Sequence, residues 1–154
     1  MHDKENDNGA KAEIDAVIRA SVVMRLAVVD GDRPWLVPLC FGYDGEKLYF
    51  HSSSRKGRKQ VILEKNGRVC FEFEDGVQVK AAEKPCNWSF SFRTVIGEGV
   101  ARELTDDEAK RAALTCIISQ YAEEKWAPAS LSLKGVQVWE IDIEEISRRY
   151  KKQE

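Results

Sequence analysis

The amino-acid sequence predicts a mainly β fold, in which an antiparallel sheet closes into a small barrel with flanking helices. The chain has 154 residues, which is enough for one domain with its own core and too few for two ordinary domains. Segments of alternating apolar and polar residues, about six or seven in all, are joined mainly by hairpin turns rather than by helical crossovers. Closing so many short strands into a barrel removes the exposed sheet edges.

Composition and charge exclude several classes of protein. Hydrophobic residues make up 43% of the chain and charged residues 32%, which is a globular mixture and not a disordered one. The 24 basic and 26 acidic residues leave a net charge of −2, so no overall positive field attracts nucleic acid or an anionic membrane. No apolar run approaches the roughly 18 to 20 residues of a membrane span, and residues 1–11 lack the apolar core of a signal peptide. We therefore expect a cytoplasmic protein with no nucleic-acid or membrane partner.

The four cysteines and two histidines of the chain indicate neither disulfide nor metal chemistry. The cysteines are Cys40, Cys70, Cys86 and Cys116. They form no CxxC pair and have no nearby histidine that would complete a zinc site. We expect no bound metal, and reduced thiols that are mostly small core residues. Cys86 is the candidate for a functional thiol, because Pro85 and Asn87 place it in a loop.

The first part of the chain is predicted to form a helix followed by strands. Residues 1–11 are expected to be a disordered tail, and residues 12–154 a single domain. Apolar residues at helical spacing predict a short amphipathic helix over residues 13–21. Strands are predicted over residues 24–29 and 34–43, on either side of an Asp-Gly-Asp turn signal.

A hairpin is predicted to follow the second of these strands. Pro38 interrupts that strand and indicates a sheet edge or a bulge, because proline cannot donate to the ladder. Asp44 and Gly45 form the strongest hairpin signal in the chain, typical of a type I′ turn. The next strand, over residues 47–52, alternates so that His51 lies on the face opposite its large apolar residues.

The rest of the chain is predicted to alternate between helices and strands. Periodicity predicts a helix within residues 53–66, strands over residues 68–74, 77–79 and 88–104, a helix over residues 105–124 and a last strand over residues 136–143. Gly67 is expected to end the first helix in the left-handed conformation. Gly97 and Gly99 predict a bulge or a sharp bend in the long strand. Thr105 and Glu108 form a capping box that would start the second helix.

Residues 49–59, YFHSSSRKGRK, carry the strongest chemical signal in the chain. They combine a strand end, three serines, a glycine and four cations at the start of a helix. Free amides at a helix N-terminus, hydroxyl donors and paired Arg and Lys side chains are the groups that a phosphate dianion needs. The alternatives are a solvated basic helix start, or a nucleic-acid patch, which the lack of other basic segments disfavours. The spacing of a Walker loop is absent.

Two further features leave alternatives open. His51 is either a hydrogen-bonded structural histidine or a general base. Trp88, Phe90 and Phe92 alternate along one strand and therefore share a face. They either pack in the core or form a wall for a flat aromatic ligand.

Several segments, taken in order, resemble the pyridoxamine 5′-phosphate oxidase-like proteins. The segments are RLAVVDGDRPWLVPLCFGYDGEKLYFHSSSRKGRK, RVCFEFE, EKPCNWSFSFRTVIGEGVAREL and VWEIDIEEI, and the resemblance covers roughly residues 13–147. Within the family the sequence is most similar to the nitroimidazole-resistance (Nim) branch. The resemblance implies a split β-barrel that binds FMN at the interface of a homodimer.

The resemblance also implies which residues bind the cofactor. It assigns the FMN phosphate to Arg58 and Lys59, the phosphate and ribityl chain to His51 and Ser52, the isoalloxazine ring to the backbone of Val37, Pro38, Leu39 and Cys40, and a polar contact to Thr94. It identifies no catalytic residue. Whether Trp88 or Trp139 also contacts the cofactor stays open.

The chain departs from the family pattern at several positions. Nim relatives usually have Asn where this chain has Cys40 and Ser where it has Thr94, so one side-chain amide is lost and one hydroxyl is kept. The Arg-Leu-His-Asp-Arg segment of true pyridoxamine phosphate oxidases is absent from the C-terminus. A substrate other than that of pyridoxal phosphate synthesis is therefore expected.

The resemblance implies an FMN-dependent oxidoreductase that acts on a small molecule. A nitroaromatic compound is the sharpest substrate expectation, with a nicotinamide cofactor as a possible electron donor. One alternative is a general flavin reductase or oxidase. Another is a non-catalytic carrier or sensor that binds FMN, a deazaflavin or haem, in which His51 would be the available axial ligand.

Overall fold

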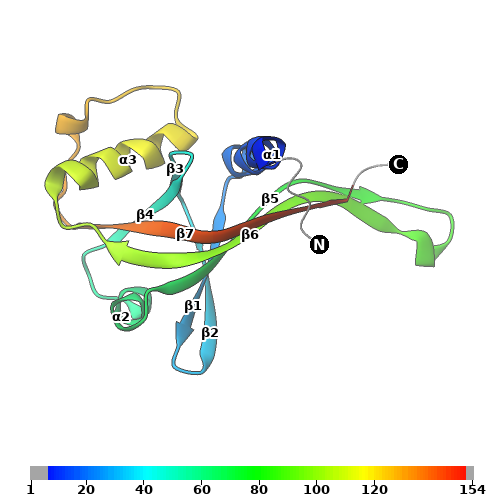
Figure 1. The fold of residues 1–154 in the computed structure, drawn as a ribbon, viewed down its shortest axis with the longest axis horizontal. Coiled ribbons are helices and arrows are strands. Elements are labelled where there is room, and N and C mark those ends of the chain that lie inside the picture. The colour runs from blue at the N-terminus through cyan, green and yellow to red at the C-terminus, as the bar shows by residue number, and fades with distance from the viewer. Residues whose placement is uncertain (1–6, 152–154) are drawn as a thin grey trace.

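Within residues 7–151, the part of the chain that the computed structural model describes, seven strands form one antiparallel sheet (Figure 1). The strands are β1 (Met24–Asp30), β2 (Arg33–Leu39), β3 (Gly42–Tyr43), β4 (Lys47–Ser53), β5 (Arg68–Lys80), β6 (Ser89–Glu103) and β7 (Val136–Lys151). The α-helices are α1 (Asp7–Ala20), α2 (Arg58–Lys65) and α3 (Asp107–Tyr121), and the 3-10 turns are η1 (Pro85–Asn87) and η2 (Pro128–Ser130). The strand order is β2-β1-β5-β6-β7-β4-β3.

The sheet must curl, because its two edge strands are consecutive in the chain. β2 ends at Leu39 and β3 begins at Gly42, so only two residues join the two edges. At 3.8 Å between consecutive Cα atoms, the strand ends lie within about 11 Å of each other. A flat sheet of seven strands would separate its edges by roughly 29 Å. The sheet is therefore an incompletely closed barrel, which confirms the predicted fold class.

The strand predicted over residues 34–43 is split in the structure. Its first part is β2, which pairs with β1, and its second part is β3, which pairs with β4 at the other edge of the sheet. Pro38 lies in the edge strand β2, as predicted. An edge position explains the proline, because one side of that strand needs no donors for a neighbour.

The turn between β3 and β4 differs from the predicted type I′ turn. That turn needs positive φ at both central residues. Gly45 has φ +97°, but no residue other than glycine has positive φ in the described part of the chain, so the prediction is wrong at Asp44. The Asp44 carboxylate instead accepts hydrogen bonds from the backbone N–H groups of Glu46 at 2.8 Å and Lys47 at 2.7 Å, which stabilises an Asx-type turn.

The N-terminal helix begins earlier than the predicted residue 13. α1 starts at Asp7, so residues 7–11 of the expected disordered tail are helical, while residues 1–6 lie outside the described part. Lys11, just after the first turn of α1, connects the helix to the β3–β4 turn. The Lys11 ammonium lies 2.8 Å from the Asp15 carboxylate, and it donates a hydrogen bond to the Gly45 carbonyl at 2.6 Å.

Two predicted helix ends are also wrong in their details. Gly67 has no positive φ, so it is not a left-handed cap. A Cβ atom at that position would lie 2.6 Å from the Ala101 carbonyl oxygen, and this close approach between strands requires the glycine. At α3 the cap is Asp106 and not Thr105, because the Asp106 carboxylate accepts the Ala109 N–H at 2.9 Å and the helix begins one residue later.

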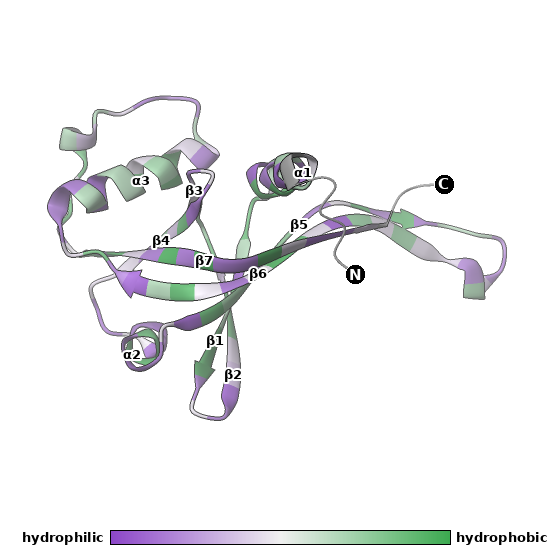
Figure 2. Ribbon diagram, viewed as in Figure 1, coloured by the Kyte–Doolittle hydropathy of each residue, from purple (hydrophilic) through white to green (hydrophobic). Residues whose placement is uncertain are grey.

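The core fills the interior of the barrel. Its largest fully buried side chains include Phe41, Phe50, Phe71 and Phe73. Figure 2 shows hydrophilic and hydrophobic residues alternating along the strands, as expected for strands with one face on the core. The pairing of β6 with β7 shifts register between Glu98 and Gly99, which confirms the predicted bulge.

The paired ends of β5 and β6 extend beyond the barrel as a hairpin (Figure 1). Trp88 is 55% exposed and Phe90 50% exposed, so of the two alternatives for these side chains, packing in the core is wrong. Phe92 is half-buried, and its ring centroid lies 5.4 Å from that of Phe90. Local alternation predicts which residues share a face, but it does not predict where the barrel ends and the face becomes exposed.

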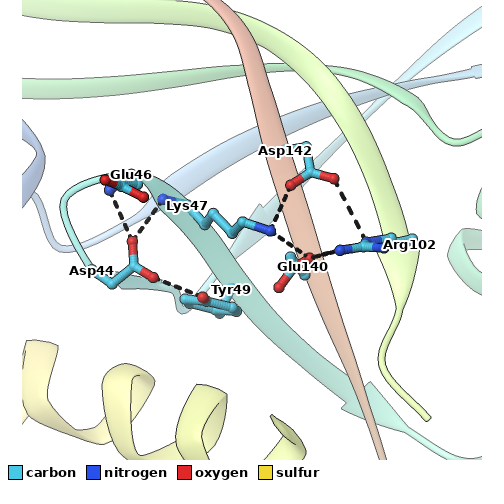
Figure 3. Close-up of polar contacts among 7 residues, drawn as sticks. All are labelled: Asp44, Glu46, Lys47, Tyr49, Arg102, Glu140 and Asp142. Carbon is cyan, nitrogen blue, oxygen red and sulfur yellow. Dashed lines mark hydrogen bonds and ion pairs between the residues drawn. The ribbon is translucent and has the colours of Figure 1, made fainter. Parts of the chain in front are cut away.

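A network of charged side chains fastens β4, β6 and β7 together (Figure 3). The Lys47 ammonium lies 2.9 Å from the Glu140 carboxylate and 2.8 Å from that of Asp142. Arg102 donates from Nε to Glu140 at 3.0 Å. Glu140 is nearly buried, and its carboxylate is paired with both Lys47 and Arg102. This network stabilises the register of the strands that carry the candidate site.

The cysteines differ from the expectation that most of them are core residues. Cys40 and Cys86 are exposed, and Cys70 and Cys116 are half-buried. All four are free thiols, and burial raises the pKa of Cys116 to about 11. Among residues 7–151 no group of three or more His, Cys, Asp or Glu side chains could hold a metal ion. No helix in the same part of the chain is long and apolar enough to cross a membrane.

Candidate functional site

The loop before α2 takes its shape from Gln60. This side chain is only 5% exposed, and its Oε1 accepts a hydrogen bond from the Gly57 N–H at 3.0 Å. Its Nε2 donates to the Ser53 carbonyl at 3.0 Å and to that of Arg55 at 3.4 Å. Sequence analysis missed this residue. A glutamine three residues after a glycine at a helix start is half of a capping box, and that signal could have found it.

Lys59 and Ser52 are the two groups at this site best suited to an anion. Lys59 is half-buried, its Nζ lies 5.6 Å from the ring centroid of Phe50, and no carboxylate within the described residues pairs with it. Burial lowers the pKa of Lys59 below its ordinary value. Ser52 is 8% exposed, and its Oγ has no hydrogen-bond partner within the described residues. An unpaired buried hydroxyl costs roughly 1–3 kcal/mol, which an anion reaching it would offset.

Two further polar atoms without a partner lie on the same face of the β4–β7 pair. Gln137 is directly opposite Ser52, and Trp139 is directly opposite Phe50. The Phe50 and Trp139 rings are stacked, with centroids 6.1 Å apart. The Oε1 atom of Gln137 and the Nε1 atom of Trp139 are buried without a partner among the described residues. This face therefore holds two donors and one acceptor, a combination that suits a phosphate ester with nearby hydroxyl groups.

Arg58 connects the start of α2 to the β1–β2 hairpin. Its guanidinium lies 3.4 Å from the Asp30 carboxylate and 4.8 Å from the ring centroid of Trp35. The side chain is 52% exposed, so this ion pair is worth little in water. A phosphate group that approaches Lys59 can therefore compete with Asp30 for Arg58.

His51 does not share a face with Ser52, because the two are neighbours on one strand. The imidazole lies on the outer side of β4. Partial burial and the nearby Lys59 cation hold the pKa of His51 below its ordinary value. The Lys59 cation therefore acts on His51 on the outer side of β4, while its Nζ lies near the ring of Phe50 on the inner side.

Residues 37–39 end the second strand of the same hairpin, residue 40 follows them, and alternate residues of this segment present two faces. Val37 and Leu39 are half-buried on the same face as Trp35, which faces the barrel interior. Pro38 and Cys40 are exposed on the outer face. Since Arg58 packs over Trp35, the start of α2 lies next to this strand. The structure therefore brings the strand and the phosphate-binding candidates into one region of a single chain.

Thr94 is not part of that region. It pairs with Arg149 on β7, whereas Ser52 pairs with Gln137 near the start of β7. At the usual rise per residue, these two points on β7 are roughly 40 Å apart. Thr94 and Pro38 both lie on the outer face of the sheet. Strands β1 and β5 lie between the strand of Pro38, β2, and that of Thr94, β6. One chain alone cannot place Thr94 and Lys59 on the same small cofactor.

Comparison with known proteins supports one family. A family model described as pyridoxamine 5′-phosphate oxidase matches residues 10–150. No curated protein matches the sequence. Among solved structures, the chain is similar to a proposed 5-nitroimidazole antibiotic resistance protein from Bacteroides thetaiotaomicron. The two share 26% sequence identity with a TM-score of 0.76, over 90% of this chain and 82% of the other.

Two other solved structures have the same fold at lower identity. An FAD and haem binding protein from Mycobacterium smegmatis has a TM-score of 0.79 and 19% identity, over 92% of this chain and 71% of that one. A flavocytochrome from Azotobacter vinelandii has a TM-score of 0.74 and 20% identity, over 92% of this chain and 67% of that one. At these identities the likeness establishes the fold alone.

Proposed function

Because the chain belongs to the pyridoxamine 5′-phosphate oxidase family, we propose that it is an FMN-dependent oxidoreductase that works as a cytoplasmic homodimer. One observation carries the proposal. Lys59, a half-buried cation with no acidic partner in the described residues, lies at the start of α2 against the ring of Phe50. Two residues after Phe50 on the same face of β4, the buried Ser52 hydroxyl also has no partner among those residues. A phosphate group fits this pair in both charge and hydrogen bonding.

The residues around α2 would hold the cofactor, and the flavin itself would supply the electron transfer. Lys59 and Ser52 bind the phosphate, and Arg58 turns from Asp30 to join them. Gln137 accepts a hydrogen bond from a ribityl hydroxyl. The backbone of residues 37–40, at the end of the edge strand β2 and just after it, would offer C=O groups to the edge of the ring, and N–H groups except at Pro38.

A nitroaromatic compound is the substrate that we propose. The similarity to the proposed 5-nitroimidazole resistance protein supports this choice. The test is to load the protein with FMN, reduce it without oxygen using a nicotinamide donor, and then add a 5-nitroimidazole. The flavin absorbance should disappear on reduction and return when the nitro compound is added. A reduced flavin that stays reduced in the presence of the nitroimidazole would contradict this substrate.

The distance between Thr94 and Lys59 supports a homodimer. If both residues contact FMN, the two must come from different chains, and a two-fold axis would create two equivalent sites. The hairpin at the ends of β5 and β6 presents exposed apolar side chains, among them Val79, Trp88 and Phe90. We propose that this hairpin forms part of the interface.

The dimer predicts an unequal effect of two tryptophan substitutions. Trp88→Ala should raise the dissociation constant of the dimer about tenfold or more, because aromatic residues at the centre of an interface often contribute at least 2 kcal/mol. Trp126→Ala is the matched control, since Trp126 is similarly exposed, at 45%, but lies near α3. Sedimentation equilibrium measures both variants. A wild-type monomer with full flavin occupancy would contradict the dimer.

FMN binding should change the titration of His51. Without ligand its pKa lies below the ordinary value, and a phosphate dianion near Lys59 would stabilise the imidazolium, so the pKa should rise when FMN binds. The sequence has two histidines, so proton NMR resolves both imidazoles, and His51→Gln identifies the resonance of His51. A His51 pKa that does not change at saturating FMN would place the phosphate elsewhere.

A second candidate is a non-catalytic carrier or sensor that binds haem. The observation that favours it is the exposed imidazole of His51, which the lowered pKa keeps neutral and able to ligate iron. The visible absorption spectrum of the purified protein separates the candidates. Flavin gives two broad bands and a yellow colour, whereas haem gives a Soret band.

A further inference from the structure

The sheet has a second polar region on its core-facing side, where α1 ceases to cover it. Along this face of β6 the side chains change from the buried Val95 to Arg93 and then to Ser91. These residues border a groove of about 520 Å³ between α1, β5, β6 and β7. This volume is in the usual range for small-molecule sites, about 300–1,000 Å³.

Strand pairing places two arginines side by side on the floor of this groove. Arg93 is opposite Tyr150, and Arg148 is opposite Val95, so the two arginines are diagonal neighbours on one face. Diagonal neighbours lie roughly 7–8 Å apart, within reach of long side chains. Ser91, two residues before Arg93 on the same face, is 7% exposed and also borders the groove.

An acidic residue holds each arginine in place at the edge of the groove. Arg148 lies 2.8 Å from the Glu13 carboxylate of α1, and it donates to the Gly9 carbonyl at 3.3 Å. Arg93 forms an ion pair with Asp75 of β5. A guanidinium has five N–H donors, so each arginine keeps donors for another anion. Because the ion pairs fix the side chains beforehand, binding an anion would cost little conformational entropy.

We propose that this groove binds a small aromatic carboxylate, at a site separate from the flavin phosphate site around α2. The carboxylate of the ligand bridges Arg93 and Arg148 and accepts a hydrogen bond from Ser91. Val17 and the ring of Tyr150, which also border the groove, contact the aromatic ring. Thr94, the residue proposed to reach the flavin of the partner chain, also borders this groove, so the test uses the protein without flavin.

Benzoate tests the proposal by NMR titration of the wild-type protein. Benzoate should bind at millimolar concentration or below and shift the backbone amides of residues 91, 93 and 148. Benzamide has the same shape without the charge, and it should bind at least tenfold more weakly. If no amide shifts in the millimolar range, or if benzamide binds as tightly as benzoate, the proposal is wrong.

Three variants locate the site. Arg93→Gln and Arg148→Gln should each weaken benzoate binding at least tenfold. Arg149→Gln is the matched control, because Arg149 borders the groove on the same strand but its side chain points to the opposite face. If Arg148→Gln loosens α1 and does not fold, Arg93→Gln decides the question, since Arg93 is half exposed. An equal loss in Arg149→Gln, or unchanged binding in Arg93→Gln, would contradict the proposal.

Discussion

Replacing both Arg58 and Lys59 by alanine is expected to weaken FMN binding by several kcal/mol, because each charge-assisted hydrogen bond is worth roughly 1.5–3 kcal/mol. Lys59 should contribute more than Arg58. Its ammonium is half-buried and has no competing carboxylate in the described residues, whereas Arg58 must leave Asp30. Quenching of FMN fluorescence during titration measures the affinity.

A second double variant controls for the loss of net charge. Arg55→Ala with Lys56→Ala removes two positive charges from the same loop. Both side chains are exposed, and Lys56 pairs with Glu64 at 3.2 Å. The Gln60 side chain holds the backbone of this loop, and it remains in both double variants. Equal losses of affinity in the two double variants would show that general charge, and not this site, attracts the phosphate.

Phe73→Ala is expected to destabilise the fold by about 3–5 kcal/mol, the usual cost of removing a buried phenylalanine. Phe73 is fully buried, and its ring centroid lies 4.7 Å from that of Phe41 and 5.9 Å from that of Phe71. Urea unfolding measures the change. Trp126→Ala removes a larger but exposed ring, and it should cost under about 1 kcal/mol. If Phe73→Ala lowered the free energy of unfolding as little as Trp126→Ala does, the barrel core would lie elsewhere.

The strands were predictable because their signal is local. Alternation along residues 47–52 correctly places Phe50 in the core and His51 on the opposite face. The errors arise where distant residues decide the conformation. Gly67 looks like a helix cap in the sequence, but the carbonyl of Ala101, on another strand, is what requires a glycine there. Trp88 alternates as a core residue does, yet it lies beyond the end of the barrel.

The candidate site was predictable in part for the same reason. Ser52, Arg58 and Lys59 lie within one short segment, so their common chemistry is visible in the sequence. Gln137 becomes their neighbour only through the pairing of β4 with β7, which no local pattern shows. Thr94 could be assigned by resemblance, but its distance from Lys59 along the sheet became apparent only in the structure.

The most direct test of the phosphate site compares FMN with riboflavin, which lacks the phosphate. Affinities of both flavins are measured for the wild-type protein and for the double variant Arg58→Ala with Lys59→Ala. The wild-type protein should prefer FMN by several kcal/mol, and the variant should bind both flavins with similar, weak affinity. If the wild-type protein binds riboflavin as tightly as FMN, or if the variant keeps the full preference for FMN, the start of α2 does not bind the flavin phosphate.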